Sequence, residues 1–137
     1  MDATTIKVGD TLPEFVRETG LENWNRFAAV QYEFVPIHMD DEAGREAGMA
    51  SAFGMGNLQW SYLHDLLRTW MGDDGRIVSV SCQFRAPNVK GQTVTAKGTV
   101  TDIRDDAGER FVDLQIWTEE QTGAPLAPGS ATVAFAL

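Results

Sequence analysis

One stretch restricts the possible folds of this chain more than any other, a helix-periodic segment from Met55 to Met71 with few polar positions. Apolar residues recur there at the three- and four-residue spacings of one helix face: Met55, Leu58, Tyr62, Leu63, Leu66, Leu67 and Trp70, with Trp60 and Met71 widening it. The remaining polar strip is narrow and consists of Ser61, His64, Asp65 and Arg68. A helix this apolar must be covered on most sides by the rest of the chain.

After Gly72 the periodicity changes from helix to strand and stays there. Alternating apolar and polar residues predict strands over 78–84, over 94–103 with a slip in phase before Ile103, and over 112–117, and a last strand over 131–137. Upstream, residues 1–9 are expected to fray. A short edge strand is expected within 9–18, because Pro13 is tolerable only at an edge, and a helix over 23–30 with Asn23 as its cap.

The predicted order is a strand, a helical region and four strands joined by hairpins. An antiparallel sheet that curls around one long apolar helix buries the apolar faces of both. We therefore expect an α+β fold of this kind. We also expect a single domain over residues 1–137, because a chain of 137 residues has room for one core but not for a second.

Charge and cysteine content restrict the partners and the compartment. The net charge of -9 argues against nucleic acid and anionic membranes, since binding phosphate needs a basic surface. No apolar run has the length of a membrane span, and the first residues lack the features of a signal peptide. Cys82, the single cysteine, fits a reducing cytoplasm, and no Cys and His cluster has metal-ligand spacing. We expect a cytoplasmic protein without a metal.

Residues 32–41 form the candidate site. Pro36 fixes its own φ and disfavours helix at Val35, which predicts an extended loop, and the acidic pair after it can cap a short helix ending near Gly48. The loop holds His38, one of two histidines, and Glu33 five residues before it. A rigid loop with these two groups suits proton chemistry, and the plainer alternative is a surface loop that happens to contain a histidine.

The chain resembles the MaoC-like hydratases and dehydratases, which have the hot-dog fold. The resemblance rests on the loop Pro36-Ile37-His38-Met39-Asp40, the glycine-led buried helix, the four-strand tail and the stretch Phe84–Thr93, which is similar to the family's Phe-Arg-x-Pro-Val-x-x-Gly-Asp-Thr turn. It covers roughly residues 10–137. It implies hydration or dehydration of 2-enoyl and (3R)-hydroxyacyl thioesters of coenzyme A or acyl carrier protein. It also implies no cofactor, the coenzyme A thioester being the substrate.

The family motif is Asp-x-Asn-Pro-x-His, and its Asp and His share a water molecule. By this resemblance His38 and Pro36 match the motif, whereas Glu33 stands in place of the Asp and Val35 in place of the Asn. The oxyanion-binding glycine at the start of the buried helix would be Gly54, with Gly56 as the neighbouring candidate. A serine that commonly supports the carboxylate has no counterpart, and its position falls by offset on Gln59.

Further residues are expected to contact the substrate. Four would form the pocket wall (Tyr32, Pro36, Met49 and Phe53), and Arg85 and Lys90 would meet the phosphates of coenzyme A. Plainer interpretations exist for several of these candidates. Gly54 and Gly56 could serve only to permit tight packing at the start of the helix, and Arg85 and Lys90 could be ordinary solvated basic residues.

The resemblance also implies that the chain pairs with a second hot-dog subunit, as a homodimer or a heterodimer. Two other functions stay open. In the first, the chain is a non-catalytic partner subunit of a heteromeric enoyl-CoA hydratase of steroid or lipid catabolism, because Glu33 and Val35 alter the family motif. In the second, it is an acyl-CoA thioesterase that uses a lone carboxylate as the base.

Overall fold

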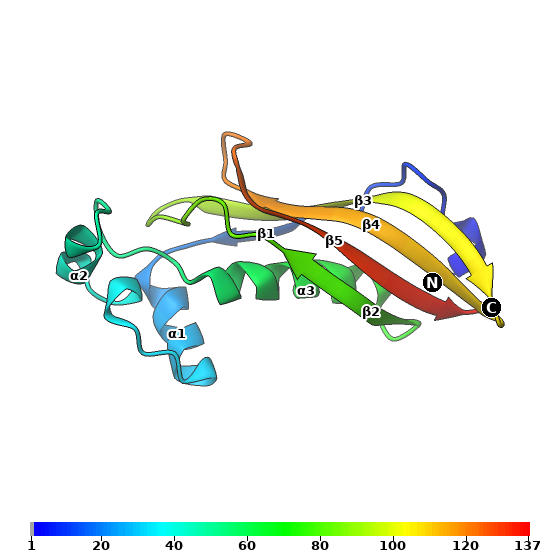
Figure 1. Ribbon diagram of the computed structural model, residues 1–137, viewed down its shortest axis with the longest axis horizontal. Helices are drawn as coiled ribbons and strands as arrows, with labels where there is room; N and C mark the ends of the chain where they lie inside the picture. The colour runs from blue at the N-terminus through cyan, green and yellow to red at the C-terminus, as the bar shows by residue number, and fades with distance from the viewer. Residues whose placement is uncertain (1) are drawn as a thin grey trace.

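The computed structural model describes residues 2–137, and its main element is a five-stranded antiparallel sheet. The strands are β1 (Phe15–Glu18), β2 (Gly75–Cys82), β3 (Thr93–Asp106), β4 (Glu109–Glu119) and β5 (Pro125–Ala136), in the spatial order β1-β3-β4-β5-β2. The helices are α1 (Leu21–Gln31), α2 (Asp41–Glu46) and α3 (Gly56–Met71), with 3-10 turns η1 (Ala3–Thr5) and η2 (Pro36–His38). The sheet curves along α3, while α1 and α2 lie beyond the end at which α3 begins (Figure 1).

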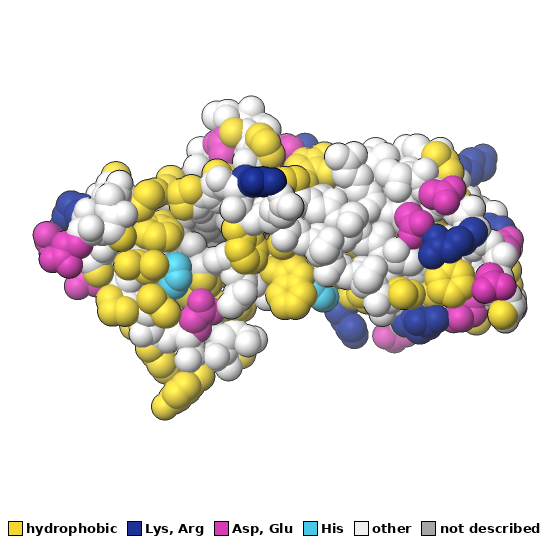
Figure 2. All heavy atoms as spheres, in the orientation of Figure 1, with side chains coloured by type: hydrophobic (Ala, Val, Ile, Leu, Met, Phe, Trp, Pro, Cys, Tyr) yellow, Lys and Arg dark blue, Asp and Glu magenta, His cyan; other side chains and the backbone are white. Residues whose placement is uncertain are grey.

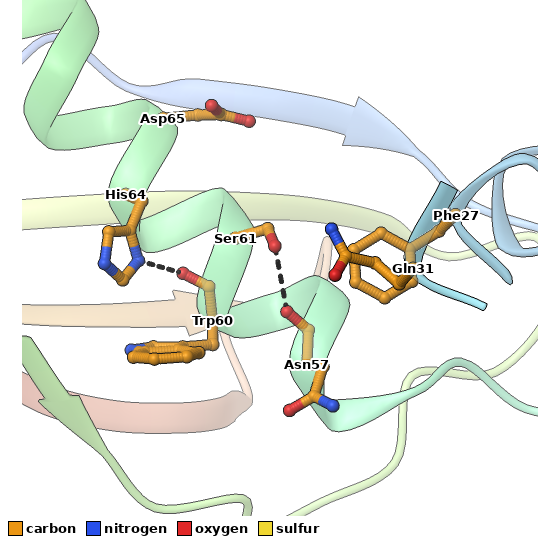
Figure 3. A pocket seen from close by; sticks show the side chains of 7 residues that line it. All are labelled: Phe27, Gln31, Asn57, Trp60, Ser61, His64 and Asp65. Carbon is orange, nitrogen blue, oxygen red and sulfur yellow. Dashed lines mark hydrogen bonds between the residues drawn. The ribbon is translucent and has the colours of Figure 1, made fainter. Parts of the chain in front are cut away.

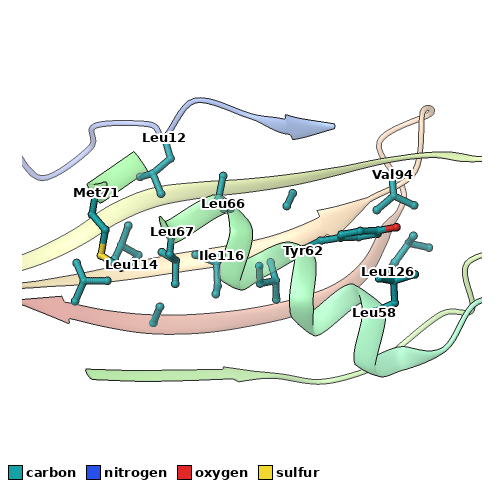
Figure 4. Close-up of a cluster of buried hydrophobic side chains, with 14 of the residues drawn as sticks. Leu12, Leu58, Tyr62, Leu66, Leu67, Met71, Val94, Leu114, Ile116 and Leu126 are labelled. Atoms are coloured by element: carbon teal, nitrogen blue, oxygen red, sulfur yellow. The ribbon is translucent and has the colours of Figure 1, made fainter. Parts of the chain in front are cut away.

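Helix α3 forms the centre of the core, as its periodicity predicts. Its buried residues, among them Leu58, Tyr62, Leu66 and Met71, face apolar residues of the sheet (Figure 4). The helix ends at Gly72, whose φ of 58° is a conformation that glycine adopts without strain. The α+β prediction of an antiparallel sheet around one long helix is confirmed.

The two central strands follow the predicted alternation. In β3 the inward residues Val94, Ala96, Gly98 and Val100 are buried, and the register shifts between Val100 and Asp102, where the sequence shows its slip in phase. In β4 Val112, Leu114 and Ile116 are buried. Each of these strands is paired on both sides, so the alternation of the sequence is also that of burial.

The expected chain of hairpins is wrong at one place. β2 pairs with β5, not with β3, and so forms one edge of the sheet while β1 forms the other. Residues 83–92 therefore cross from one side of the sheet to the other. They pass the start of α3, where Phe53 bridges Val89 and the Gly54 N–H donates to the Asn88 carbonyl at 2.7 Å. This crossing segment forms part of the candidate site.

The burial predicted for residues 78–84 is confirmed in part. Val80 and Cys82 pack against the core as expected, whereas Val78 is 45% exposed, and Phe84, beyond the end of β2, is 53% exposed. A register shift between Ile77 and Ser79 changes which residues of the strand face the core, and an edge strand has a neighbour on one side only.

The chain ends and caps differ from expectation as well. Residues 3–5 are ordered rather than frayed, because Asp2 caps their turn and Ala3 and Ile6 join the core. Helix α1 begins after Gly20, and Asn23 lies in its first turn, where its side chain accepts from the Gly20 N–H at 2.9 Å. β5 starts six residues earlier than predicted, at Pro125.

Candidate functional site

The loop after α1 turns back toward the core and buries His38. Tyr32 ends the helix with a left-handed φ of 55°, and Val35 is extended, as expected before a proline. The next three residues form η2 instead of the fully extended loop that we predicted, because the fixed φ of Pro36 also suits the first position of a helical turn. Asp40 then caps α2, accepting from the Glu42 N–H at 2.8 Å.

A hydrogen bond to the backbone fixes the tautomer of His38. The side chain is 8% exposed, and its Nδ1 lies 2.7 Å from the Phe53 carbonyl oxygen. A carbonyl oxygen can only accept, so Nδ1 carries the hydrogen. In the neutral ring Nε2 is then unprotonated and able to accept a proton.

His38 lines a cavity of about 260 Å³ together with residues from two other parts of the chain. The lining residues are His38, Phe53, Gly54, Gly56, Gln59, Phe84, Arg85, Ala86 and Pro87. Five of the expected catalytic and substrate-binding residues therefore meet here, namely His38, Phe53, Gly54, Gly56 and Arg85, together with Gln59. The described residues 2–137 hold no group of three side chains placed to bind a metal ion.

The two glycines at the start of α3 differ in what their backbone can offer a ligand. The Gly54 N–H already donates to the Asn88 carbonyl at 2.7 Å. Gly56 is the first residue of α3, where a backbone N–H has no acceptor within the helix, and Met55 before it provides no side-chain cap. Gly56, with the positive end of the helix dipole, is therefore the donor available to an anionic oxygen in the cavity.

Glu33 lies outside this cavity but reaches the same end of α3. It is half-buried, and its Oε2 accepts from Nδ2 of Asn57 at 3.4 Å. His38 and Glu33 thus bind residues on either side of Gly54-Met55-Gly56. The position expected for a supporting serine is engaged elsewhere: Gln59 is buried and accepts from the Thr118 hydroxyl at 2.6 Å.

The two basic candidates differ in their contacts. Arg85 is exposed at the cavity and donates to the side chain of Gln83. Lys90 is bound to Asp41, at 2.7 and 2.8 Å from its two carboxylate oxygens. This lysine, with the Ala52 N–H as second donor, lowers the pKa of the Asp41 carboxyl.

The remaining pocket candidates lie away from the cavity. Tyr32 is 86% exposed, its ring packed edge-on against Phe34. Pro36 is exposed, and Met49 is half-buried with its N–H donating to Gly44. Apolar side chains gather at the end of the molecule that holds α1 and α2, whereas charged side chains dominate the end that holds the termini (Figure 2).

A second cavity, of about 430 Å³, lies between α1 and the polar strip of α3. Its lining includes the other histidine, His64, whose Nδ1 lies 3.0 Å from the Trp60 carbonyl one turn earlier (Figure 3). Asn57 also lines this cavity, so it lies between the cavity and Glu33.

Several residues of the site were not singled out from the sequence, among them Phe84, Asn88 and Asn57. Phe84 and Asn88 lie within the stretch that carries the family resemblance, which was a signal for them. Asn57 had no signal, because an asparagine in the first turn of a helix is ordinary.

Comparisons with known proteins identify the family and the fold. The sequence profile of the MaoC like domain matches residues 7–121. The (R)-specific enoyl-CoA hydratase of Aeromonas caviae is 28% identical over 134 residues, which cover 97% of this chain and 98% of the relative.

Solved structures share the fold. The (R)-hydratase from A. caviae involved in PHA biosynthesis superposes with a TM-score of 0.86 at 26% identity, over 96% of this chain and 98% of that one. A chain of the ChsH1–ChsH2 complex from Mycobacterium tuberculosis gives a TM-score of 0.84 at 20% identity, over 96% and 98%. The hot-dog fold is thereby confirmed. Since the matching profile spans most of the sequence, the chain belongs to the MaoC-like domain family.

Proposed function

We propose that this chain is a hydro-lyase that hydrates 2-enoyl thioesters and dehydrates (3R)-hydroxyacyl thioesters of coenzyme A or acyl carrier protein. The observation that carries the proposal is the bond from His38 Nδ1 to the Phe53 carbonyl, which leaves Nε2 free as a proton acceptor beside a helix N-terminus. The name of the A. caviae relative, an (R)-specific enoyl-CoA hydratase, supports the same chemistry.

The two ends of the reaction need different groups. Water adds to C3 of the enoyl group as Nε2 of His38 accepts one of its protons, and the imidazolium then donates that proton to C2. Glu33, as the acid–base partner of His38, would orient the water. Negative charge develops on the thioester oxygen, where the Gly56 N–H and the dipole of α3 stabilise it. Every step is a proton transfer or an addition, so the proposed reaction uses no cofactor.

The experiment is an assay of the isolated chain with 2-enoyl-CoA, following the loss of absorbance of the conjugated thioester. We expect turnover, and a loss of about a thousandfold in kcat for His38→Ala, within the usual range for removing an acid–base group. His64→Ala is the matched control, because this second histidine bonds only within α3, and it should keep its activity.

Other results would contradict the proposal in separate ways. Full activity of His38→Ala would remove the histidine from the mechanism. Release of free thiol from acyl-CoA would identify a thioesterase. If turnover appears only after a second hot-dog chain is added, the chain is the non-catalytic partner of a heteromeric hydratase.

We also propose that β2 forms the interface of a dimer with a second copy or with a related hot-dog chain. β2 is an edge strand, and beside it Trp60, Val80 and Phe84 line a shallow cavity of about 280 Å³. A strand from another chain would pair with the open edge and cover these apolar groups. The complex named ChsH1–ChsH2 is an example of two chains assembling in this structural class.

We expect the protein to act in the cytoplasm, where Cys82 stays reduced. No helix within residues 2–137 is long and apolar enough to cross a membrane.

A further inference from the structure

The first turn of α3 contacts Glu33 through one side chain. Nδ2 of Asn57 donates to Oε2 of Glu33 at 3.4 Å, between residues 24 positions apart in the sequence. The backbone of Asn57 is held by its own helix, because the Ser61 hydroxyl donates to the Asn57 carbonyl at 3.0 Å (Figure 3). Asn57 thus presents a side-chain donor, from the first turn of the helix, to a carboxylate that directly follows the left-handed Tyr32.

We infer that Asn57 is a positioning residue for the carboxylate of Glu33, and that it replaces the side chain expected at Gln59. This inference rests on the proposed hydration chemistry, in which Glu33 is half of the acid–base pair. Gln59 is unable to take this role, since its amide is buried and bound to Thr118 and to the Ala86 carbonyl at 2.6 and 3.4 Å.

The length of the glutamate explains the change of position. Its carboxylate extends about 1.5 Å further than that of an aspartate. A donor on a different part of α3 is then needed to hold the longer side chain in a productive orientation, because displacements of about 1 Å cost about a hundredfold in rate. Asn57 provides this donor from a position adjacent to Gly56, which lines the His38 cavity.

The charged groups on the surrounding elements do not compete for Glu33. Arg26 of α1 binds Glu22, Arg45 of α2 binds Glu42, and Lys90 of the crossing segment binds Asp41. Further titratable groups on these elements are Tyr32 directly before Glu33, His38 on η2 and Asp40 at the cap of α2. His64 and Asp65 line the second cavity together with Asn57.

The test compares Asn57→Ala in two backgrounds. In the wild-type chain we expect kcat to fall about tenfold, as for one lost hydrogen bond to a charged group, with KM unchanged. In a Glu33→Asp background the shorter carboxylate no longer reaches Asn57, so Asn57→Ala should add nothing. Arg68→Ala, on the exposed strip of the same helix and in its last turn, is the control and should leave kcat unchanged in both backgrounds.

A second readout does not need turnover. The crystal structure of Asn57→Ala without ligand should show the Glu33 carboxylate displaced from its wild-type position, because it has lost the Asn57 donor. Equal effects of Asn57→Ala in both backgrounds, or an unmoved carboxylate, would overturn the inference. If the wild-type chain shows no turnover but the carboxylate moves in Asn57→Ala, the proposed function fails and the positioning of Glu33 stands.

Discussion

Gly54 and Gly56 both lie at the cavity, and each is required for a different contact. A Cβ at Gly56 would lie 2.6 Å from the ring of Phe84, which covers the start of α3. A Cβ at Gly54 would lie 2.8 Å from Trp24 Nε1 and 2.9 Å from Asn88 Oδ1, both buried. Both glycines therefore have the packing role that was their plainer interpretation, and Gly56 alone keeps an N–H for the proposed oxyanion role.

Gly54→Ala should therefore destabilise the protein, by about 1–3 kcal/mol, because Trp24 and Asn88 are both buried and would have to shift to admit the methyl group. The measurement is urea unfolding followed by tryptophan fluorescence. Gly20→Ala is the matched control, since a Cβ at Gly20 meets nothing within 4 Å and its backbone is extended. Equal midpoints for the two variants would refute the packing argument.

At the scale of elements, the short helix α2 is held to the rest of the site by one carboxylate. Asp41 accepts from the Ala52 N–H at 3.1 Å and pairs with Lys90 on the crossing segment. Ala52 directly precedes Phe53, whose carbonyl orients His38. Asp41 and Lys90 thus hold together two segments that surround the histidine, so Lys90 acts in the fold even without a coenzyme.

The ion pair between Asp41 and Lys90 should weaken in acid. The pKa of Asp41 is lowered in the folded chain, chiefly by Lys90, so its stabilisation is present above the ordinary value of 3.8 and is lost as pH falls through the folded value. Thermal unfolding from neutral to acid pH should show wild type more stable than Asp41→Asn at neutral pH, with the gap closing below about pH 4.

Lys90→Met is the companion variant for this test. It removes the main cause of the lowered pKa, so its own gap to wild type should close over the same range of pH. A gap that stays constant for both variants would mean that the pair contributes nothing through the titration of Asp41.

The elements also show where sequence periodicity is a sufficient guide. Strands β3 and β4 have neighbours on both sides and one face on α3, so the alternation at Val94–Val100 predicts their burial correctly. In β2 the alternation of apolar and polar residues does not fully match the burial of their side chains, because the strand has a bulge after Ile77 and lies at an open edge. No local sequence pattern reveals the bulge or the edge position. The crossover of residues 83–92 is likewise a property of strand order, which periodicity does not encode.

The same distinction holds for the site. His38 and the start of α3 were predictable, because a proline-fixed loop and a glycine-led helix leave local marks in the sequence. The hydrogen-bond partners of these groups were not predictable, because they come from distant parts of the sequence. Phe53 is 15 residues from His38, and Asn57 is 24 residues from Glu33. Such pairs form only when α1, η2 and α3 come together.

At the scale of the whole molecule, the two edges of the sheet provide a test of assembly. Val78 on β2 and Val16 on β1 are each 45% exposed, one on either edge. If β2 is the dimer interface, Val78→Lys should convert the dimer to a monomer in light scattering after size exclusion, whereas Val16→Lys should not. Dissociation by Val16→Lys alone would place the interface at the other edge, and a wild-type monomer would call for a different chain as partner.

The bond between His38 and residue 53 has a consequence for how this protein can evolve. The acceptor is a backbone carbonyl, so it survives any replacement of the side chain at position 53 that keeps the local fold. The Phe53 ring, in contrast, is part of the cavity wall and lies edge-on to the histidine at 5.5 Å. Selection can therefore reshape the cavity wall at this position, and with it the range of substrates of the proposed reaction, without disturbing the histidine that we propose as the acid–base group.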